Sequence, residues 1–223
     1  MGIKDTYRVS SINARDTYDW LLHKHYAKRI PSISWAFGLF DKDNLLQGVC
    51  TFGKPASHPL RNGIAGDSCA DSVYELNRLV VNDDCPKNSS SFFVGRCLKM
   101  LPKDLILVSY ADISQGHIGK IYQATNWIYT GFSAKRTDWK IRGMEHLHGQ
   151  TIADQTRGMR DRAAYMRNKY GDDFYLEERS TKHRYVFFTG KKYSLNYPVL
   201  PYPKGESKRY DASYQPQVQT TLF

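Results

Sequence analysis

The 223-residue chain is poor in cysteine and has no long apolar run. Its four cysteines, Cys50, Cys69, Cys85 and Cys97, form no CxxC pair, so the spacing does not indicate a structural zinc site or a thiol redox motif. No signal peptide precedes them, and we expect reduced thiols in a cytoplasm. No apolar stretch approaches the roughly 20 residues that a membrane-spanning helix needs, so no membrane partner is expected.

Internal repeats are also absent, whereas positive charge and tyrosine are abundant. The formal net charge is +10, and 16 tyrosines are present. Residues 1–132 carry a net charge of +3 and residues 133–223 one of +7. A basic half with interleaved aromatic residues indicates a polyanionic partner, and nucleic acid is the first candidate. Many basic proteins bind no nucleic acid, so charge alone leaves both interpretations open.

Hydrophobic periodicity predicts alternating strands and helices in the first part of the chain. The expected strands are 7–13, 34–40, 46–52, 73–81, 104–112 and 127–133, and the expected helices are 14–28, 92–101 and 116–125. Asn13 is a plausible N-cap of the first helix, and Pro31 closes that segment. One of the serines Ser89, Ser90 and Ser91 is the expected cap of the second helix. Residues 53–71, rich in glycine and proline, are expected to form a long loop.

The second part of the chain is predicted to differ from the first. A basic helix is expected at 151–170 and a strand at 183–188, followed by a poorly structured tail after about residue 198. We therefore predict an α+β chain, in which residues 1–133 form the catalytic core. Residues 134–223 would then form a basic extension that packs on the core and contacts DNA.

The order of elements in the core resembles the GNAT acyltransferase fold, a twisted mixed sheet flanked by helices. The strand–helix–strand unit in residues 73–112 predicts two adjacent parallel strands, splayed at their ends. In that fold the first of these strands, the following loop and a helix N-terminus hold an acyl donor, here acetyl-CoA or a related molecule. The residues that the resemblance assigns to this cofactor are Leu79, Val81, Lys87, Asn88, Ser89, Ser90 and Ser91.

The loop of residues 84–91 lacks the glycines of that family. Lys87 and the serines could replace them, because N–H groups at a helix start and a lysine charge both attract phosphate. A simple serine-capped helix is the alternative. Residues 121–131 resemble the segment in which many GNAT enzymes keep a general acid, and Tyr122 holds that place. A phenol with a pKa near 10 is protonated at neutral pH and can donate, although a packed helical tyrosine is equally compatible with the pattern.

Six segments resemble the Mom family of bacteriophage DNA modification proteins more specifically. They are 25–29 (HYAKR), 75–79 (ELNRL), 110–112 (YAD), 117–127 (HIGKIYQATNW), 131–138 (GFSAKRTD) and 183–185 (HRY). The resemblance covers roughly residues 15–205. It implies an enzyme in the cytoplasm of the bacterial host that converts adenine N6 in double-stranded DNA to a carbamoylmethyl derivative and so protects phage DNA from restriction. The alternatives are a conventional acetyl-CoA-dependent N-acetyltransferase acting on a protein or small amine, and a non-catalytic DNA-binding module.

An enzyme that elaborates adenine N6 must extract the base, take a proton from N6 and hold an activated carbon in line. With the resemblance, His25 is predicted to be a base or a metal ligand, and Tyr26 a stacking platform for the base. Asp112 ends an apolar strand, where a carboxylate can orient an amine. Glu75 is a second candidate base, and Arg78 could neutralise a donor carboxylate or phosphate.

Because side chains alternate along a strand, either Glu75 or Arg78 is expected to face away from the site. The resemblance leaves iron open as a cofactor, with Asp112 and either His25 or His117 as ligands to test. The His-x-His pairs His23/His25 and His146/His148 lack the framework of a structural zinc site.

The basic residues of the second part predict the contacts with DNA. Arg160 and Arg167 fall about two turns apart on the expected helix, so one face could follow a phosphate backbone. A solvated helix face is the alternative. The predicted DNA contacts are Lys28, Arg29, Lys135, Arg136, Arg160, Arg167, Lys182 and Arg184. The sequence does not indicate an oligomeric state.

Overall fold

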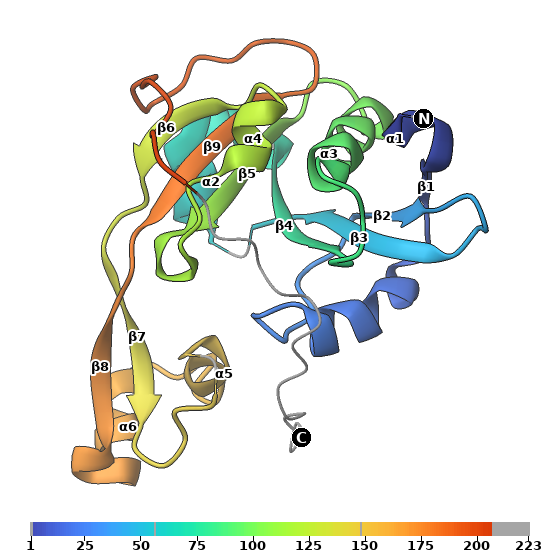
Figure 1. Cartoon of the computed structure of the whole chain (residues 1–223). Helices are drawn as coiled ribbons and strands as arrows, with labels where there is room; N and C mark the ends of the chain where they lie inside the picture. Colours follow the sequence, from blue (N-terminus) through green and yellow to red (C-terminus); the bar gives the residue numbers. More distant parts are fainter. Residues whose placement is uncertain (1, 56, 148, 207–223) are drawn as a thin grey trace. The chain divides into compact units, whose positions relative to one another are not determined.

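The computed structural model describes residues 2–55, 57–147 and 149–206 (Figure 1). The chain divides into two compact units. The main unit contains the described residues of Met1–Phe132 and of His183–Phe223, and the inserted unit contains those of Ser133–Lys182. Among the residues described, no helix has the length and apolarity that crossing a lipid bilayer requires.

A seven-stranded mixed sheet forms the centre of the main unit, with the strand order β1-β2-β3-β4-β5-β9-β6. The strands are β1 (Arg8–Ser11), β2 (Trp35–Phe40), β3 (Leu46–Gly53), β4 (Val73–Val81), β5 (Ile106–Asp112), β6 (Ile128–Phe132) and β9 (Lys182–Phe188). The first four strands pair antiparallel, as do β6 and β9, whereas β4 and β5 are parallel. The prediction of a mixed sheet flanked by helices is confirmed.

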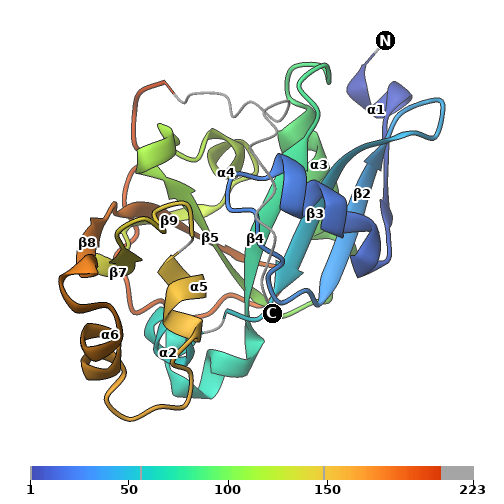
Figure 2. The same cartoon turned by 90° about the horizontal axis from the view of Figure 1, so that it is seen from below.

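Strands β4 and β5 pair over only part of their length. Their register joins Val73 to Ile106, Tyr74 to Leu107 and Glu75 to Val108, although both strands continue further. Figure 2 shows the two strands diverging beyond this stretch. We call the end of their pairing, after Glu75 and Val108, the splay point. The predicted adjacent, parallel and splayed arrangement of these strands is confirmed.

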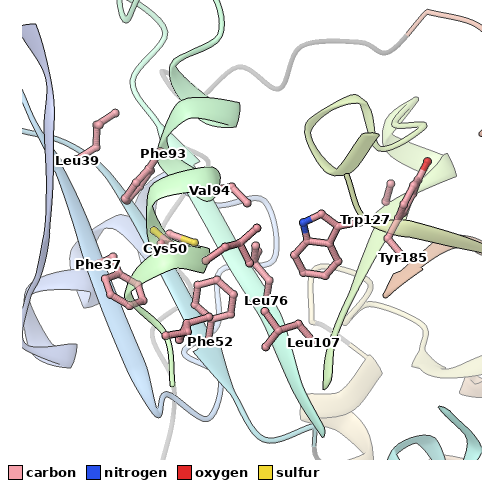
Figure 3. Packing of buried hydrophobic residues seen from close by; sticks show 14 of the residues in the cluster. Phe37, Leu39, Cys50, Phe52, Leu76, Phe93, Val94, Leu107, Trp127 and Tyr185 are labelled. Atoms are coloured by element: carbon pink, nitrogen blue, oxygen red, sulfur yellow. The ribbon is translucent and has the colours of Figure 1, made fainter. Parts of the chain in front are cut away.

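The sheet buries a different apolar cluster on each of its faces. On one face, α3 (Ser89–Met100) and α4 (Lys120–Ala124) cover the largest cluster, which includes Leu76, Leu107 and Trp127 (Figure 3). We call this side the α3 face. The opposite side, the α2 face, buries two smaller clusters under α2 (His58–Ala65) and under the helical turns that precede β2. A short helix, α1 (Ile3–Thr6), precedes β1.

The predicted first helix is shorter and less regular than expected. It consists of a 3₁₀ turn, η1 (Ala14–Thr17), and a π turn, η2 (Trp20–Lys24). Asn13 is confirmed as the N-cap, because its side chain accepts the Arg15 N–H at 3.0 Å. The chain becomes extended at His25, well before Pro31, so the predicted continuation to residue 28 is wrong. π turns occur frequently at functional sites.

Two further expectations for the main unit are corrected. The segment 53–71, predicted to be a loop, contains α2 and a 3₁₀ helix, η3 (Asp67–Ser72). Ser57 caps α2 by accepting the Leu60 N–H at 3.3 Å, and Ile64 anchors the helix in the core. The three serines expected to cap the next helix lie inside its first turn, and Asn88, at a φ of 72°, is the residue that precedes it.

The predicted extent of the second part, residues 134–223, differs from the structure. Strand β9 lies between β5 and β6, so residues 183–188 belong to the central sheet rather than to an extension. The segment after Pro198 was predicted to be poorly structured. Within the described residues it is bonded to the edge of the sheet: the Leu200 N–H donates to the Tyr129 carbonyl at 2.9 Å, and the Tyr202 hydroxyl donates to the Trp127 carbonyl at 2.7 Å. Residues 207–223 of the predicted tail lie outside the described residues.

The inserted unit has a small core of its own. Two strands that were not predicted, β7 (Arg136–Ile141) and β8 (Phe174–Arg179), pair antiparallel. Ile141, Ile152, Met166 and Phe174 pack against each other under them. The single helix predicted at 151–170 is wrong. The structure has α5 (Gly149–Asp154), α6 (Arg162–Tyr170) and a 3₁₀ turn, η5 (Gly171–Asp173).

Candidate active site at the splay point

A β-bulge in β4 sets the geometry of the candidate site. Arg78 lies opposite Thr51, but Leu76 lies opposite Phe52, the next residue of β3. Asn77 is therefore an extra residue in β4. Its side-chain oxygen accepts the Thr51 hydroxyl at 2.6 Å, and its amide nitrogen donates to the Ser32 carbonyl at 2.8 Å. These bonds hold the bulge next to the splay point.

The bulge places Glu75 and Arg78 on the same face of β4. Leu76 is buried on the α3 face, so its neighbour Glu75 points to the α2 face. Val80 packs on the α2 face, and Arg78, two residues earlier, shares that side. The prediction that one of the two faces away from the site is wrong, because it assumed an unbroken alternation along the strand.

Arg78 links β4 to the segment that carries Tyr26. Its Nε and Nη2 donate to the Arg29 carbonyl at 3.4 and 3.3 Å, and its Nη1 donates to the Asn77 carbonyl at 2.6 Å. Burial lowers the pKa of the Arg78 guanidinium, whereas Tyr26 and Glu75 raise it. An arginine stays protonated through such shifts, so a positive charge is fixed beside Tyr26 and Glu75.

His25 and Tyr26 follow the π turn as a stacked pair. Their ring centroids lie 4.4 Å apart, with 28° between the ring planes. His25 is buried, and its Nδ1 accepts the Ala27 N–H at 3.0 Å. A neutral imidazole with Nδ1 as an acceptor carries its proton on Nε2. In this geometry the His25 ring stacks on Tyr26, and its Nε2 can donate a hydrogen bond. For His25 to act as the predicted base at Nδ1, its bond from the Ala27 N–H would first have to break. Tyr26 is 39% exposed.

Two hydroxyl groups meet on the other face of the sheet. The Ser109 Oγ of β5 lies 2.8 Å from the Tyr122 Oη of α4 and 2.8 Å from the carbonyl oxygen of Leu76. The Tyr122 ring packs against Trp127 and Tyr185. Burial raises the pKa of Tyr122, and the hydrogen bond from Ser109 lowers it. Tyr26 and Glu75 also raise this pKa, because negative charge on these groups of the opposite face disfavours ionisation of the phenol.

Asp112 is buried at the end of β5 and caps the next turn. Its Oδ1 accepts the Ser114 N–H at 3.0 Å and the Ser114 hydroxyl at 2.7 Å, at the start of the 3₁₀ turn η4 (Ile113–Gln115). Burial lowers the pKa of His117, and the charge of Asp112 raises it. The carboxylate therefore supports the turn that follows β5.

The described residues do not fit the iron that the resemblance left open. Within them, no three side chains of His, Cys, Asp or Glu come together as a metal ion would require. Asp112 uses its Oδ1 to cap η4, and His25 uses its Nδ1 to accept the Ala27 N–H. His148, of the second His-x-His pair, lies outside the described residues.

The residues predicted to hold a cofactor lie on the α3 face and in the loop before α3. Leu79 and Val81 pack against the apolar cluster under α3. Lys87 and Asn88 are exposed. Ser89 is buried, and its hydroxyl donates to the Pro86 carbonyl at 2.7 Å. The Ser91 hydroxyl donates to the Asn88 carbonyl at 3.0 Å. Two of the three serine hydroxyls therefore stabilise the loop itself, and Lys87 and Ser90 are better placed to meet an anion.

The predicted DNA contacts lie in different surroundings. Of these predicted contacts, four exposed side chains belong to the inserted unit: Lys135, Arg136, Arg160 and Arg167. Arg160 precedes α6 and Arg167 lies on it, so the predicted common helix face is wrong. Lys28 and Arg29 follow Tyr26 in the main unit and are half-buried, and Lys182 is also half-buried, at the start of β9.

Arg184 is used inside the main unit. It is 8% exposed, and its Nε and Nη2 donate to the Thr130 hydroxyl and carbonyl, both at 2.9 Å. Its guanidinium also lies 3.4 Å from the centroid of the Tyr197 ring. A cation enclosed in this way is not available to contact a DNA phosphate, so its predicted DNA contact does not fit the structure.

Sequence reasoning missed Ser109. It is a serine in the middle of a mainly apolar strand, and a small polar residue at such a position is the signal that could have found it. Its bonding partners come from β4 and α4, which are far from it in the sequence.

With this geometry in place, the comparisons with known proteins decide the family. The model of the Mom protein family matches residues 6–204. The chain belongs to the Mom protein family. A curated member similar to it is the methylcarbamoylase mom of Escherichia phage Mu. It is 30% identical over 208 residues, and the match covers 88% of this chain and 83% of the phage Mu protein.

Solved structures similar to this Mom family member are acetyltransferases with low sequence identity. An N-acetyltransferase from Staphylococcus aureus Mu50 is 13% identical, with a TM-score of 0.43, and the match covers 82% of this chain and 98% of that chain. The yncA protein from Salmonella typhimurium, solved with its cofactor acetyl-CoA, is 8% identical, with a TM-score of 0.46. That match covers 84% of this chain and 96% of the other.

Proposed function

We propose that this chain is a transferase that converts adenine N6 in double-stranded DNA to a carbamoylmethyl-type derivative and so protects phage DNA from restriction. Membership of the Mom family over residues 6–204 is the observation that carries this proposal. The phage Mu relative is a methylcarbamoylase, and the match spans most of both chains. The charged residues at the splay point provide groups that suit an amine acceptor.

The α2 face is the proposed acceptor side. A base taken out of the duplex needs an aromatic surface to stack on, and the exposed ring of Tyr26 provides one. Glu75, on the same face, is the proposed base toward N6. Arg78 fixes the segment that carries Tyr26 through its bonds to the Arg29 carbonyl. The Tyr26 ring is thereby held in position relative to the Glu75 carboxylate of the same strand as Arg78.

The α3 face is the proposed donor side. An acyl-CoA-type donor, when bound, would supply an acyl carbon activated by its thioester and release a thiolate. Acyl transfer alone gives an amide at N6, so a carbamoylmethyl group also requires a nitrogen donor and an oxidant. The residues present fit such a group: beyond the splay point the described parts of β4 and β5 no longer pair with each other, which leaves strand edges for an extended arm. The exposed Lys87 at the start of α3 suits a phosphate. Tyr122 is protonated and is the proposed proton donor toward the leaving group.

The donor side can be tested by calorimetry with acetyl-CoA as the probe. Lys87→Ala combined with Ser90→Ala should weaken binding while the thermal unfolding temperature stays that of the parent. Ser89→Ala removes a hydroxyl that bonds to Pro86, so it serves as a matched control that affects the loop rather than the ligand. Unchanged affinity in the double variant, or no binding by the parent, would count against an acyl-CoA donor.

The function itself is tested on DNA from cells that express the protein. Nucleosides from that DNA and from vector-only cells are compared by mass spectrometry, together with digests of total protein. The expected result is a heavier deoxyadenosine only in the expressing cells, and DNA that resists restriction enzymes with adenine in their sites. Acetylated protein lysines with unmodified deoxyadenosine would instead favour a conventional N-acetyltransferase.

A further inference from the structure

One hydroxyl group connects the two strands at the splay point to the proposed acid. Ser109 is 1% exposed, and its Oγ lies 2.8 Å both from the carbonyl oxygen of Leu76 in β4 and from the Oη of Tyr122 in α4. Both distances are those of a full hydroxyl hydrogen bond. The serine is thus shared between a backbone acceptor and a group that can either donate or accept.

The number of hydrogens restricts how these bonds can be arranged. Ser109 has one hydroxyl hydrogen and Tyr122 has one. Both bonds exist together only if Ser109 donates to the Leu76 carbonyl and Tyr122 donates to the Ser109 Oγ. If Tyr122 gives its hydrogen to another group, the Ser109 hydroxyl can rotate and donate to the Tyr122 oxygen instead. The geometry therefore provides two arrangements, in which the Ser109 O–H bond points to a different acceptor and the Tyr122 hydrogen lies on a different group.

We propose that Ser109 is a positioning residue that holds the Tyr122 hydroxyl before the reaction and donates a hydrogen bond to it once Tyr122 has given up its proton. The proposal rests on the proposed function, in which Tyr122 is the proton donor. The proton balance is simple: the Tyr122 O–H bond breaks, its proton goes to the leaving group, and the Ser109 proton stays on Ser109. The Leu76 carbonyl loses the Ser109 hydrogen bond during this step and regains it when Tyr122 is reprotonated.

The surroundings of Tyr122 make such a partner necessary. A phenolate at this buried position loses its hydration, which is costly unless a hydrogen bond replaces it. Burial raises the pKa of Tyr122, and Cys50, Glu75 and Tyr26 raise it further; the Ser109 hydrogen bond acts in the opposite direction. A hydroxyl that donates to an anionic oxygen forms a shorter and roughly twofold stronger bond than one between neutral groups. The hydrogen bond from Ser109 therefore stabilises Tyr122 more after proton transfer than before it.

A double-mutant cycle separates positioning from a purely structural role. The measured quantity is the single-turnover rate of deoxyadenosine modification in an oligonucleotide duplex, for the parent, Ser109→Ala, Ser109→Thr and Tyr122→Phe, and for Ser109→Ala combined with Tyr122→Phe. Ser109→Ala should lower the rate about 10- to 100-fold, which is less than the roughly 10²- to 10⁴-fold contribution of the general acid itself. Ser109→Thr keeps a hydroxyl and should restore the rate to within a few-fold of the parent. In the Tyr122→Phe background, Ser109→Ala should have almost no further effect.

If Ser109→Ala lowers the rate equally in both backgrounds, the serine only ties β5 to β4 through Leu76, and the proposal is overturned. A parent rate in Ser109→Ala would overturn it as well. If Ser109→Ala fails to fold, Ser109→Cys replaces it, because a thiol keeps a side chain of similar shape with a much weaker donor. Its rate should then fall between those of the parent and of Tyr122→Phe.

A second measurement needs no activity. Tyr122 is replaced by 3,5-difluorotyrosine, whose phenol ionises at lower pH, and its ionisation is followed by fluorine NMR in the full chain. Ser109→Ala should raise the pKa of this phenol, and Ser109→Thr should leave it close to the parent value. An unchanged pKa in Ser109→Ala would overturn the link between the two hydroxyls. A raised pKa in a protein that leaves deoxyadenosine unmodified would instead support the link and reject the proposed function.

Discussion

The two faces of the sheet differ sharply at the splay point. On the α2 face, Tyr26, Glu75 and Arg78 bring opposite charges and a partly exposed ring together. On the α3 face, Ser109 and Tyr122 offer two neutral hydroxyls in apolar surroundings. A charged, accessible surface suits the activation of a polar amine, whereas a dry, neutral surface keeps a phenol protonated and ready to donate.

The largest effect is expected on the neutral face. Tyr122→Phe removes one oxygen without opening a cavity, and modification of deoxyadenosine should fall about 10²- to 10⁴-fold, which is the usual contribution of a positioned acid. Affinity for duplex DNA should stay unchanged. Tyr193→Phe is the matched control: its hydroxyl donates to the Asp104 carbonyl, just before the other end of β5. If both variants retained the parent rate in nucleoside mass spectrometry, Tyr122 would not be the acid.

A smaller but still large effect is expected on the charged face. Glu75→Gln keeps the shape of the side chain and removes its charge, so the modification rate should fall by about 10²-fold if Glu75 is the base. Asp71→Asn, an exposed carboxylate near the start of β4, is the control. An unaltered rate in Glu75→Gln would show that the charged face does not carry the base.

The affinity for DNA should change in a variant that leaves both faces of the sheet unaltered. Arg160→Ala combined with Arg167→Ala removes two exposed cations of the inserted unit. The slope of log affinity against log salt should become shallower by about 0.9 for each phosphate that the protein no longer neutralises, while the rate at saturating DNA stays that of the parent. Lys42→Ala with Lys99→Ala alters net charge equally and is the control, measured by fluorescence anisotropy. An identical slope in both double variants would place the DNA-binding surface elsewhere.

The smallest expected effect concerns the pH dependence of stability. Burial lowers the pKa of His117 below its value in the unfolded chain, so the folded state resists a proton that the unfolded state accepts. The free energy of unfolding should therefore fall as the pH drops below about 6.5, and this loss is absent above it. In urea melts at about pH 7.5 and about pH 5.5, His117→Gln should reduce the difference between the midpoints. The exposed His58→Gln should leave that difference unchanged.

Much of the main unit could be predicted from the sequence because its strands are short apolar runs separated by clear turns. The unit from Val73 to Asp112 has a parallel crossover, for which only one hand packs well, so its pairing followed from the pattern. The inserted unit was harder to predict. Its strands β7 and β8 are rich in charged residues and bury only a few side chains, so they lack the apolar alternation that marks a strand. At the break before α6, Arg162 donates to the Thr156 hydroxyl at 3.0 Å.

By itself, the sequence determined the family, the types of most elements of the sheet and the identity of Tyr26, Glu75, Arg78 and Tyr122 as candidate site residues, because these follow from local pattern and motif. Only the tertiary structure decided which of these side chains share a face. The bulge at Asn77 inverts the alternation of β4, and it is set by the register with β3 and by bonds to Thr51 and Ser32. The link from Ser109 to Leu76 and Tyr122 likewise joins three elements. Long-range hydrogen bonds of this kind leave no local signal. Each partner residue fits the pattern of its own segment whether or not it later forms the bond.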